Sequence, residues 1–419
     1  MLLSTPVLRI RDFRFLIINK FLLTFGLQMI GVIVGWQIYQ LTHDPLSLGL
    51  IGFAEAIAFI SFALWAGHIA DQTEKRFLII FSECVAFACA AVLWGLTCER
   101  NTHTLPIYGV IALSGVARAF LWSSSTSFAE LIVPKEIYST AAAWNSSAWE
   151  IASILGPATG GLVYGFWGPK MAYGIATLIV GISLVFALRL GKRHPIRGQR
   201  DEKVFESLMT GIRFVFSHQM ILAALALDMF AVLFGGVVAV LPIFAEILRV
   251  GPAGLGFLRA SQSVGAIAMA IVQTRRAPFR NTGRTLLTAV TIFGLCIIAF
   301  GLSTNFYLSM ALLALAGMAD NVSVIIRASI LQASTPNHMR GRVSAVNGIF
   351  IGSSNEIGMF ESGLAAKMMG IVPSVLFGGF MTLVTVAGIM GRFPRLRRLK
   401  SVASLGPASE GSDVEMTGI

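Results

Sequence analysis

Charged residues are scarce in this 419-residue chain: lysine, arginine, aspartate and glutamate together make up 13% of it, against 55% for the hydrophobic residues. A soluble globular protein needs roughly 25% charged residues to cover its surface. The shortage, together with a mean hydropathy of +0.76, excludes an ordinary soluble domain. We therefore expect a protein that resides in a lipid bilayer.

Cysteine and histidine are also rare, and their positions exclude several classes of function. The four cysteines (Cys84, Cys89, Cys98 and Cys296) show neither metal-binding spacing nor the pattern of a disulfide framework. The histidines fall in predicted loops or at span ends, and no nucleophile–base pair stands out. The chain also lacks the phosphate loop of ATP-driven pumps. We expect no enzyme, no metal and no cofactor.

Long apolar runs are what the chain has in abundance. A helix needs about 20 apolar residues to cross the hydrocarbon core, and we count about twelve such runs. They are expected at residues 13–40, 47–69, 77–98, 105–129, 139–165, 170–190, 219–246, 253–273, 285–302, 305–331, 343–367 and 371–391. The predicted fold is an all-α integral membrane protein with twelve transmembrane helices.

Basic residues predict the orientation of these spans, because loops rich in lysine and arginine remain on the cytoplasmic side. They gather at the N-terminus, after the sixth span, between spans eight and nine, and at the C-terminus: Arg9, Arg11, Arg14, Lys20, Arg189, Lys192, Arg193, Arg197, Arg200, Lys203, Arg213, Arg275, Arg276, Arg280, Arg284, Arg392, Arg395, Arg397, Arg398 and Lys400. The opposite loops hold only Arg100, Lys170, Arg249 and Lys367. We expect a multi-pass protein of the cell inner membrane with both termini cytoplasmic. The same asymmetry accounts for the net charge of +11, so no nucleic-acid partner is expected.

The two halves of the chain resemble each other, which predicts two pseudo-symmetric six-helix bundles. A shift of about 202 residues lays Gly115–Arg118 (GVAR) on Gly317–Asp320 (GMAD), and Pro134, Ala143, Asn145 and Gly156 on Pro336, Ala345, Asn347 and Gly358. A shift of 204 lays Gly52, Phe53 and Glu55 on Gly256, Phe257 and Arg259. Parallel repeats of this kind are typical of one large class of secondary transporter. The predicted domains are 1–190 and 219–391 for the bundles, 191–218 for a cytoplasmic linker, and 392–419 for a cytoplasmic tail.

The linker is expected to hold a short amphipathic helix. Val204, Leu208, Ile212 and Val215 share one face of a helix, with polar residues on the other. This pattern is typical of a helix that lies on the inner membrane surface.

Eight charged residues are predicted inside the spans: Glu55, Arg118, Glu150, Asp228, Arg259, Asp320, Arg327 and Glu356. Each costs at least about 2.5–3.5 kcal/mol if it faces lipid, so they must face one another or a wet cavity. One interpretation is a polar cavity in which carboxylates take and release protons; the other is a set of fixed ion pairs between helices. The proton-coupling candidates are Asp320, Glu150, Asp228, Glu356 and Glu55. The repeat places Arg118 at the position of Asp320, and Glu55 at that of Arg259.

The stretch GHIADQTEKR (Gly67–Arg76) resembles the signature loop of the major facilitator superfamily, G-x-x-x-D-R-x-G-R-R. Gly67, Asp71, Lys75 and Arg76 match the pattern, whereas Gln72 and Glu74 depart from it. The resemblance implies that the aspartate meets the start of span eleven and locks one conformation. Arg340 and Arg342 would supply the opposite charge there.

Span five contains SILGPATGGLVYG, which resembles the G-x-x-x-G-P-x-x-G-G motif of exporters in this superfamily. Gly156, Pro157, Gly160 and Gly161 match, and Ala152 replaces the first glycine. Plain helix packing through small residues is the other interpretation of this motif. With the loops at 133–147 and 335–348, the chain is similar to the branch that contains enterobactin exporters and macrolide-efflux proteins.

This resemblance implies alternating access, in which two bundles rock around a central site, driven by proton entry. The substrate is expected to be a small molecule, siderophore or drug-like, and the protein to act as a monomer among membrane lipids. The candidate substrate-cavity residues are Arg118, Trp122, Arg327, Gln28, Phe25 and Trp36. A lysophospholipid flippase or a nutrient uptake permease of the same fold is the alternative. A membrane enzyme or a non-transporting receptor is a remote one.

Overall fold

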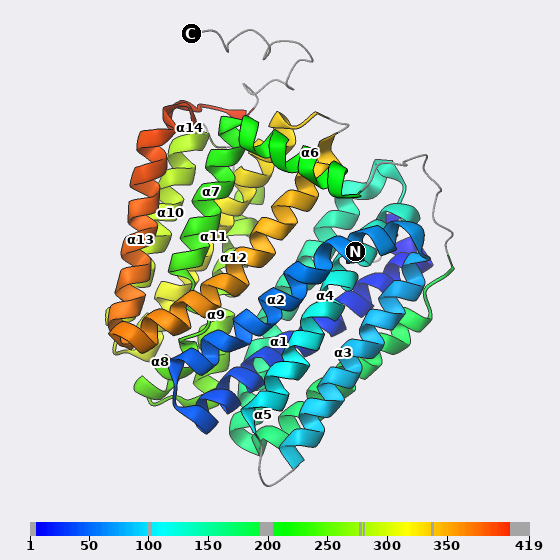
Figure 1. Cartoon of the computed structure of the whole chain (residues 1–419), viewed down its shortest axis with the longest axis vertical. Helices are drawn as coiled ribbons and strands as arrows, with labels where there is room; N and C mark the ends of the chain where they lie inside the picture. Colours follow the sequence, from blue (N-terminus) through cyan, green and yellow to red (C-terminus); the bar gives the residue numbers. More distant parts are fainter. Residues whose placement is uncertain are drawn as a thin grey trace.

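The computed structural model describes residues 6–98, 103–192, 204–275, 279, 281–336 and 339–402, and every regular element within these ranges is a helix (Figure 1). The all-α prediction is therefore confirmed. The first half contains η2 (Pro6–Arg9), α1 (Arg11–Thr42), α2 (Pro45–Gln72), α3 (Lys75–Cys98), α4 (Thr104–Ile132), η3 (Lys135–Ile137) and α5 (Tyr138–Leu188). The second half contains α6 (Val204–Ser217), α7 (Gln219–Gly235), α8 (Leu241–Ile247), α9 (Gly251–Thr274), α10 (Thr282–Leu302), α11 (Phe306–Ser334), α12 (Arg340–Met369), α13 (Ile371–Arg392) and α14 (Pro394–Arg398).

Nine helices of the described ranges are long and apolar enough to cross a membrane, and a tenth crossing is the bent pair Met209–Ser217 and Gln219–Gly235. Helix α5 has 51 residues, and Gly168 interrupts it with a φ of 79°. At 1.5 Å per residue this is about 75 Å, more than twice the hydrocarbon thickness, so α5 supplies two crossings. Helix α12 has 30 residues but more polar ones. The arrangement is consistent with twelve crossings.

The predicted span at 219–246 is not one helix. Helix α7 ends at Gly235, Gly236 is extended, and α8 begins at Leu241. Pro242 lies in the first turn of α8, where its missing N–H breaks no helical hydrogen bond. The glycine pair and this proline therefore divide the span, which its continuous hydrophobicity did not reveal.

Two helix pairs make most of the contact between the halves, and smaller contacts join α1 to α8 and α9 and α2 to α6. Helix α1 packs on α5, and α2 and α3 pack on α4; α9 packs on α11, and α7 and α10 pack on α13. Between the halves, α2 lies along α12 (Figure 1), and α5 packs on α9. The exact domain boundaries stay a prediction.

Helix α6 and α14 lie at one end of the molecule, the upper end in Figure 1. We call this the α6 end, and the end with the α1–α2 connection the far end. Helix α6 is the helix expected in the linker. Its Val215 is fully buried with residues of α7 and α12 such as Leu225 and Val346, so this part of its apolar face lies against protein. The side chains of Val204 and Leu208 lie outside the described residues.

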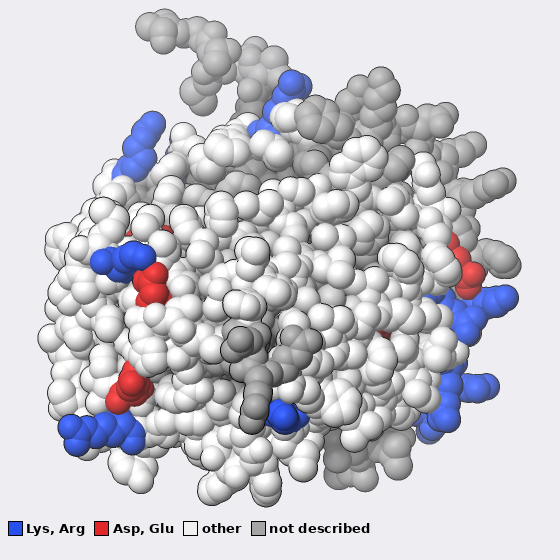
Figure 2. All heavy atoms as spheres, turned by 60° about the horizontal axis from the view of Figure 1, so that its bottom comes forward, with Lys and Arg blue, Asp and Glu red and all other residues white. Residues whose placement is uncertain are grey.

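The outer surface is apolar, as a membrane protein requires. Leu105, Phe166, Trp167, Tyr307 and Met368 are each at least 65% exposed. Figure 2, which brings the far end toward the viewer, shows few charged side chains on a mostly uncharged surface. A bilayer covers such a surface, and tryptophan and tyrosine are common at its two interfaces.

Candidate functional site

The first group of charges lies where the two halves meet. The Nη1 atom of Arg118 on α4 is 3.1 Å from Oε1 of Glu55 on α2 and 2.8 Å from Oε1 of Glu356 on α12. Helix α12 belongs to the second half of the chain and the other two helices to the first. This ion pair therefore spans the interface between the halves.

Two further groups complete the surroundings of this arginine. Its guanidinium lies over the ring of Phe59, 4.9 Å from the centroid. Arg259 of α9 lies within electrostatic range of both Glu55 and Glu356. With two arginines and two glutamates ionised, the four charges sum to zero, which lowers the cost of holding them inside a membrane. We call these four residues the interface cluster.

Glycines allow the helices of the interface cluster to approach. A Cβ atom on Gly115 of α4 would lie 2.8 Å from the carbonyl oxygen of Glu55, and one on Gly52 would lie 2.7 Å from the carbonyl oxygen of Glu356. Only glycine fits at such distances without displacing a helix. These contacts bring the two glutamates within reach of Arg118.

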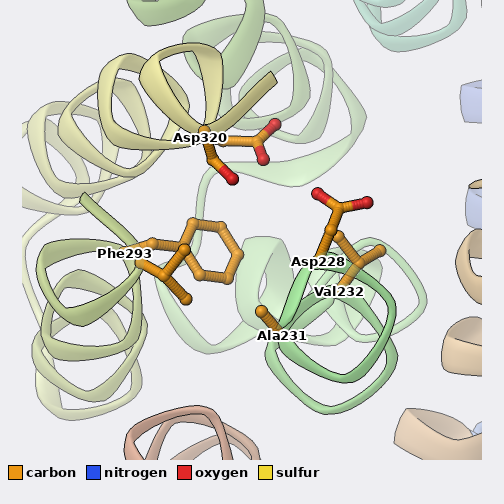
Figure 3. Close-up of a pocket in the computed structure, with 7 residues that line it drawn as sticks. Asp228, Ala231, Val232, Phe293 and Asp320 are labelled. Atoms are coloured by element: carbon orange, nitrogen blue, oxygen red, sulfur yellow. The ribbon is translucent and has the colours of Figure 1, made fainter. Parts of the chain in front are cut away.

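The second group of charges lies inside the second half. Asp228 of α7 forms a buried ion pair with Arg327 of α11. Asp228 and Asp320 line a small pocket with Ser323 and several apolar residues, and in Figure 3 the Asp228 carboxylate points toward the helix that carries Asp320. Ala231, Val232, Val290 and Phe293 form the apolar wall. We call Asp228, Asp320 and Arg327 the α11 cluster.

Glu150 of α5 joins the α11 cluster from the first half. It lies within electrostatic range of Asp320, and its Oε2 atom is buried with no hydrogen-bond partner. Among the described residues, neither Glu150 nor Asp320 has an ion-pair partner, although the other three predicted acids do. Two acids without a cation therefore approach each other from opposite halves. One proton shared between them would relieve their repulsion.

At the far end the two halves are held in contact. Nζ of Lys367 on α12 is 2.8 Å from Oδ2 of Asp44, which caps α2 through the N–H of Leu46. The hydrogen bond from Lys367 holds the pKa of Asp44 below its usual value. A Cβ on Gly363 would lie 2.6 Å from Cα of Gly49, so α12 and α2 touch there through backbone.

The predicted substrate-cavity residues are placed unequally. Trp122 is 63% exposed, and its Nε1 would lie 3.5 Å from a Cβ on Gly348 of the other half. Gln28 donates a hydrogen bond to Ser153, and Phe25 is partly buried. Trp36 is 6% exposed and packs in the main hydrophobic core. This burial does not fit its predicted place on the wall of a substrate cavity, where a side chain has to be accessible. Arg118 and Arg327 are both engaged by carboxylates.

The residues of the signature loop are only partly described. Lys75 is buried and donates to the carbonyl of Ala70, and Arg76 donates to the carbonyl of Leu188 at 2.8 Å. Gly67 has open space around it. Arg340 donates to Gln332, and Nη1 of Arg342 is 3.4 Å from the sulfur of Met339. The side chain of Asp71 lies outside the described residues, so the predicted lock stays a prediction.

The span-five motif contacts two different helices. Gly156 and Gly160 lie against α1, where their Cβ atoms would be 2.8 Å from the carbonyl of Phe25 and 2.9 Å from that of Met29. Gly161 lies against Gly256 of α9, and the carbonyl of Pro157 faces the same glycine. The motif thus packs α5 against α1 in its own half and against α9 in the other half.

One buried carboxylate in the first half is not among the site residues predicted from the sequence. Glu83 of α3 is fully buried; it accepts a hydrogen bond from Asn19 at 2.7 Å and lies 3.2 Å from the hydroxyl of Ser183. It lies near the start of a predicted span, where a charge resembles a snorkelling residue. Lys20, assigned to the basic N-terminus, lies within α1 and donates to Asn145 at 2.9 Å.

The chain is similar to exporters over nearly its whole length. It is 26% identical to the Enterobactin exporter EntS of Escherichia coli O157:H7 over 406 residues, which covers 95% of this chain and 96% of that protein. The EntS protein of Shigella boydii serotype 18 is 26% identical over 405 residues, with 95% of each chain covered.

Solved structures share the fold at much lower identity. A bacterial homolog of the human lysosomal transporter Spinster, in an inward-facing and occupied conformation, has a TM-score of 0.74 at 13% identity over 94% of this chain and 99% of that one. A point mutant of the nucleoside transporter NupG has a TM-score of 0.69 at 15% identity, over 91% and 100%. The family model described as transmembrane secretion effector matches residues 4–413. With this match, the fold and the curated relatives, the chain belongs to the transmembrane secretion effector family of the major facilitator superfamily, whose members are transporters and not enzymes.

Proposed function

We propose that this protein exports a small organic molecule across the inner membrane and couples each export step to proton entry. The observation that carries the proposal is the approach of Glu150 and Asp320 from opposite halves without a cation between them. Unneutralised charge inside a membrane is costly, so a proton on this acid pair stabilises one arrangement of the halves. A conformation-dependent proton site is what coupling requires.

The similarity to Enterobactin exporter EntS supports export and a siderophore-like substrate. Enterobactin is therefore the first probe to test. In this conformation Arg118 is engaged by Glu55 and Glu356, so an anionic substrate must be recognised elsewhere or after this ion pair opens. The exposed indole of Trp122 and the Lys20–Asn145 pair are the candidate contacts for an aromatic anion.

We also propose the orientation given by the basic residues. The α6 end, which carries α6 and the basic α14, would face the cytoplasm, and the far end would face the periplasm. The contact between Asp44 and Lys367 would then close the periplasmic side. The protein would work as a monomer surrounded by lipid.

Transport into inverted membrane vesicles tests the proposal. An acidic interior should drive uptake of enterobactin, and collapse of the pH gradient with a protonophore should abolish it. Ethidium and a labelled lysophospholipid are tested in parallel as a cationic drug and a lipid. Enterobactin uptake that ignores the gradient would contradict proton coupling. Transport of the lipid alone would favour a flippase.

A further inference from the structure

The internal repeat places opposite charges at two equivalent helix crossings. Arg118 follows Gly115 by one turn on α4, and Asp320 follows Gly317 by one turn on α11. On the partner helices, Glu55 of α2 corresponds to Arg259 of α9. Each crossing therefore combines one arginine and one acid, with the two positions exchanged.

The two crossings lie within one helical turn of each other in the repeat. A Cβ atom on Gly115 would lie close to two residues of α2: 2.8 Å from the carbonyl oxygen of Glu55 and 3.2 Å from the Cβ of Ala58. Gly317 lies against the backbone of Gln262 on α9, which is the repeat counterpart of Ala58. The helices of each pair also run in the same direction. An ion pair between Arg259 and Asp320 would therefore join the two positions that correspond in the repeat to the observed pair of Glu55 and Arg118.

In this structure only the first of the two pairs is formed. Glu55 and Arg118 are 3.1 Å apart, whereas neither Arg259 nor Asp320 has an ion pair among the described residues. Arg259 is directed across the interface instead. Its Nη2 atom lies 3.3 Å from where a Cβ of Gly31 would be on α1, a helix of the first half.

We infer that Arg259 alternates between two sets of acids: Glu55 and Glu356 across the interface when the far end is closed, and Asp320 in its own half when the far end opens. Arginine stays charged under all physiological conditions, so inside the membrane it is stabilised by staying within range of a carboxylate. Separation of α5 from α9 withdraws Arg259 from the first half. Asp320 is the acid that the repeat places within its reach.

This exchange gives the proposed proton coupling a mechanism, and it depends on that function only in assuming that the halves alternate. While Arg259 points across the interface, Asp320 faces the acid Glu150 and the occupied Asp228–Arg327 pair, so it is stable with a proton. The O–H bond of the carboxyl breaks while the far end is still closed, and its proton passes to water at the α6 end, which faces the cytoplasm in the proposed orientation. Arg259 then pairs with the carboxylate as the far end opens, and a proton that enters from the far end displaces Arg259 and restores the closed state. Arg259 is thus a positioning residue, and Asp320 is the proton carrier.

The population of the two conformations can be measured directly with spin labels at the far end. Lys170 on α5 and Met368 on α12 are exposed and lie in opposite halves. Labels are attached through Lys170→Cys and Met368→Cys in a background in which Cys84, Cys89, Cys98 and Cys296 are alanine. Double electron–electron resonance then gives the ratio of the short to the long distance.

The test compares Asp320→Asn in the presence and absence of Arg259. In the wild-type background, Asp320→Asn removes the partner of Arg259 in the open state and should raise the closed-to-open ratio by about tenfold, which is the scale of one charge-assisted hydrogen bond. In the Arg259→Gln background the same substitution should change the ratio by less than about twofold. Arg259→Lys, which keeps the charge, should restore most of the response to Asp320→Asn.

Glu361→Gln is the matched control, because Glu361 is a partly buried acid on α12, which is neither of the two helices of this crossing. It should shift the ratio equally with and without Arg259. An equal response to Asp320→Asn in the two backgrounds would overturn the inference. The measured quantity is a distance distribution, which does not depend on transport. Vesicles that move substrate without a pH gradient would contradict the proposed proton coupling and leave the Arg259 result unaffected.

Discussion

The crossing of α2 with α4 and the crossing of α9 with α11 are built alike and charged differently. Both use a glycine, Gly115 and Gly317, to bring two helices into backbone contact. The first crossing completes its ion pair and extends it to Glu356 in the other half. The second leaves Asp320 without a cation among the residues that line its pocket. The difference shows that two similar glycine crossings hold different charges: one forms an ion pair that joins the halves, and the other leaves an acid without a cation in its pocket.

The largest expected difference between the crossings is in transport. Asp320→Asn should abolish uptake driven by a pH gradient, because the side chain can no longer exchange a proton. Glu55→Gln should retain part of it, since Arg118 still contacts Glu356. Both are measured as enterobactin uptake into inverted vesicles, with folding checked by size-exclusion chromatography. Gradient-driven uptake by Asp320→Asn that equals wild type would remove Asp320 from the mechanism.

The second difference is in stability. Arg327→Met should destabilise the protein by about 3–5 kcal/mol, because it leaves Asp228 as an uncompensated buried charge. Arg118→Met should cost less, since Arg259 remains in range of both glutamates. Thermal unfolding in detergent measures the two variants. Adding Asp228→Leu to Arg327→Met should recover most of the loss; no recovery would mean that packing of the arginine stem, and not charge, had set the cost.

Substitutions of the two glycines allow a sharper comparison of the α2–α4 and α9–α11 crossings. Gly317→Leu should destabilise by about 1–3 kcal/mol or more through overpacking against the backbone of Gln262. Gly115→Leu should cost a similar amount, because its Cβ would lie 2.8 Å from the carbonyl oxygen of Glu55. Gly388→Leu on α13 is the control, since nothing lies within 4 Å of its Cβ position. Equal melting temperatures for all three variants would refute the role of the crossings.

The smallest effect is expected at the far end. Lys367 holds the pKa of Asp44 below its ordinary value of about 3.9, so the pair is intact above that value and is lost only as pH falls through the lowered pKa. Being partly exposed, the pair should contribute less than about 1 kcal/mol. Asp44→Asn should therefore lower the melting temperature slightly and by the same amount at pH 8 and pH 5. A loss confined to pH 8 would show that the carboxylate already titrates between these values.

Several parts of the site followed from the sequence. A charge inside an apolar run needs a partner of opposite charge, so the eight predicted charges are expected to gather. Five of them form ion pairs, and Arg259 lies within electrostatic range of Glu55 and Glu356. Glu83 escaped the same argument because it lies near the start of its span, and hydropathy alone does not distinguish a snorkelling side chain from one bonded to Asn19. The break after α7 was missed because hydrophobicity is continuous across Gly235 and Gly236.

The amino-acid sequence by itself determined the all-α membrane fold, the duplication, and which depths carry charge, since apolar run length and repeat offset depend only on residue order. The tertiary structure decided which charges meet. Arg259 turns to the first half, and Glu150 faces Asp320 across the interface. These pairings depend on how two helix bundles are placed relative to each other, and long side chains such as arginine can reach acids on either side.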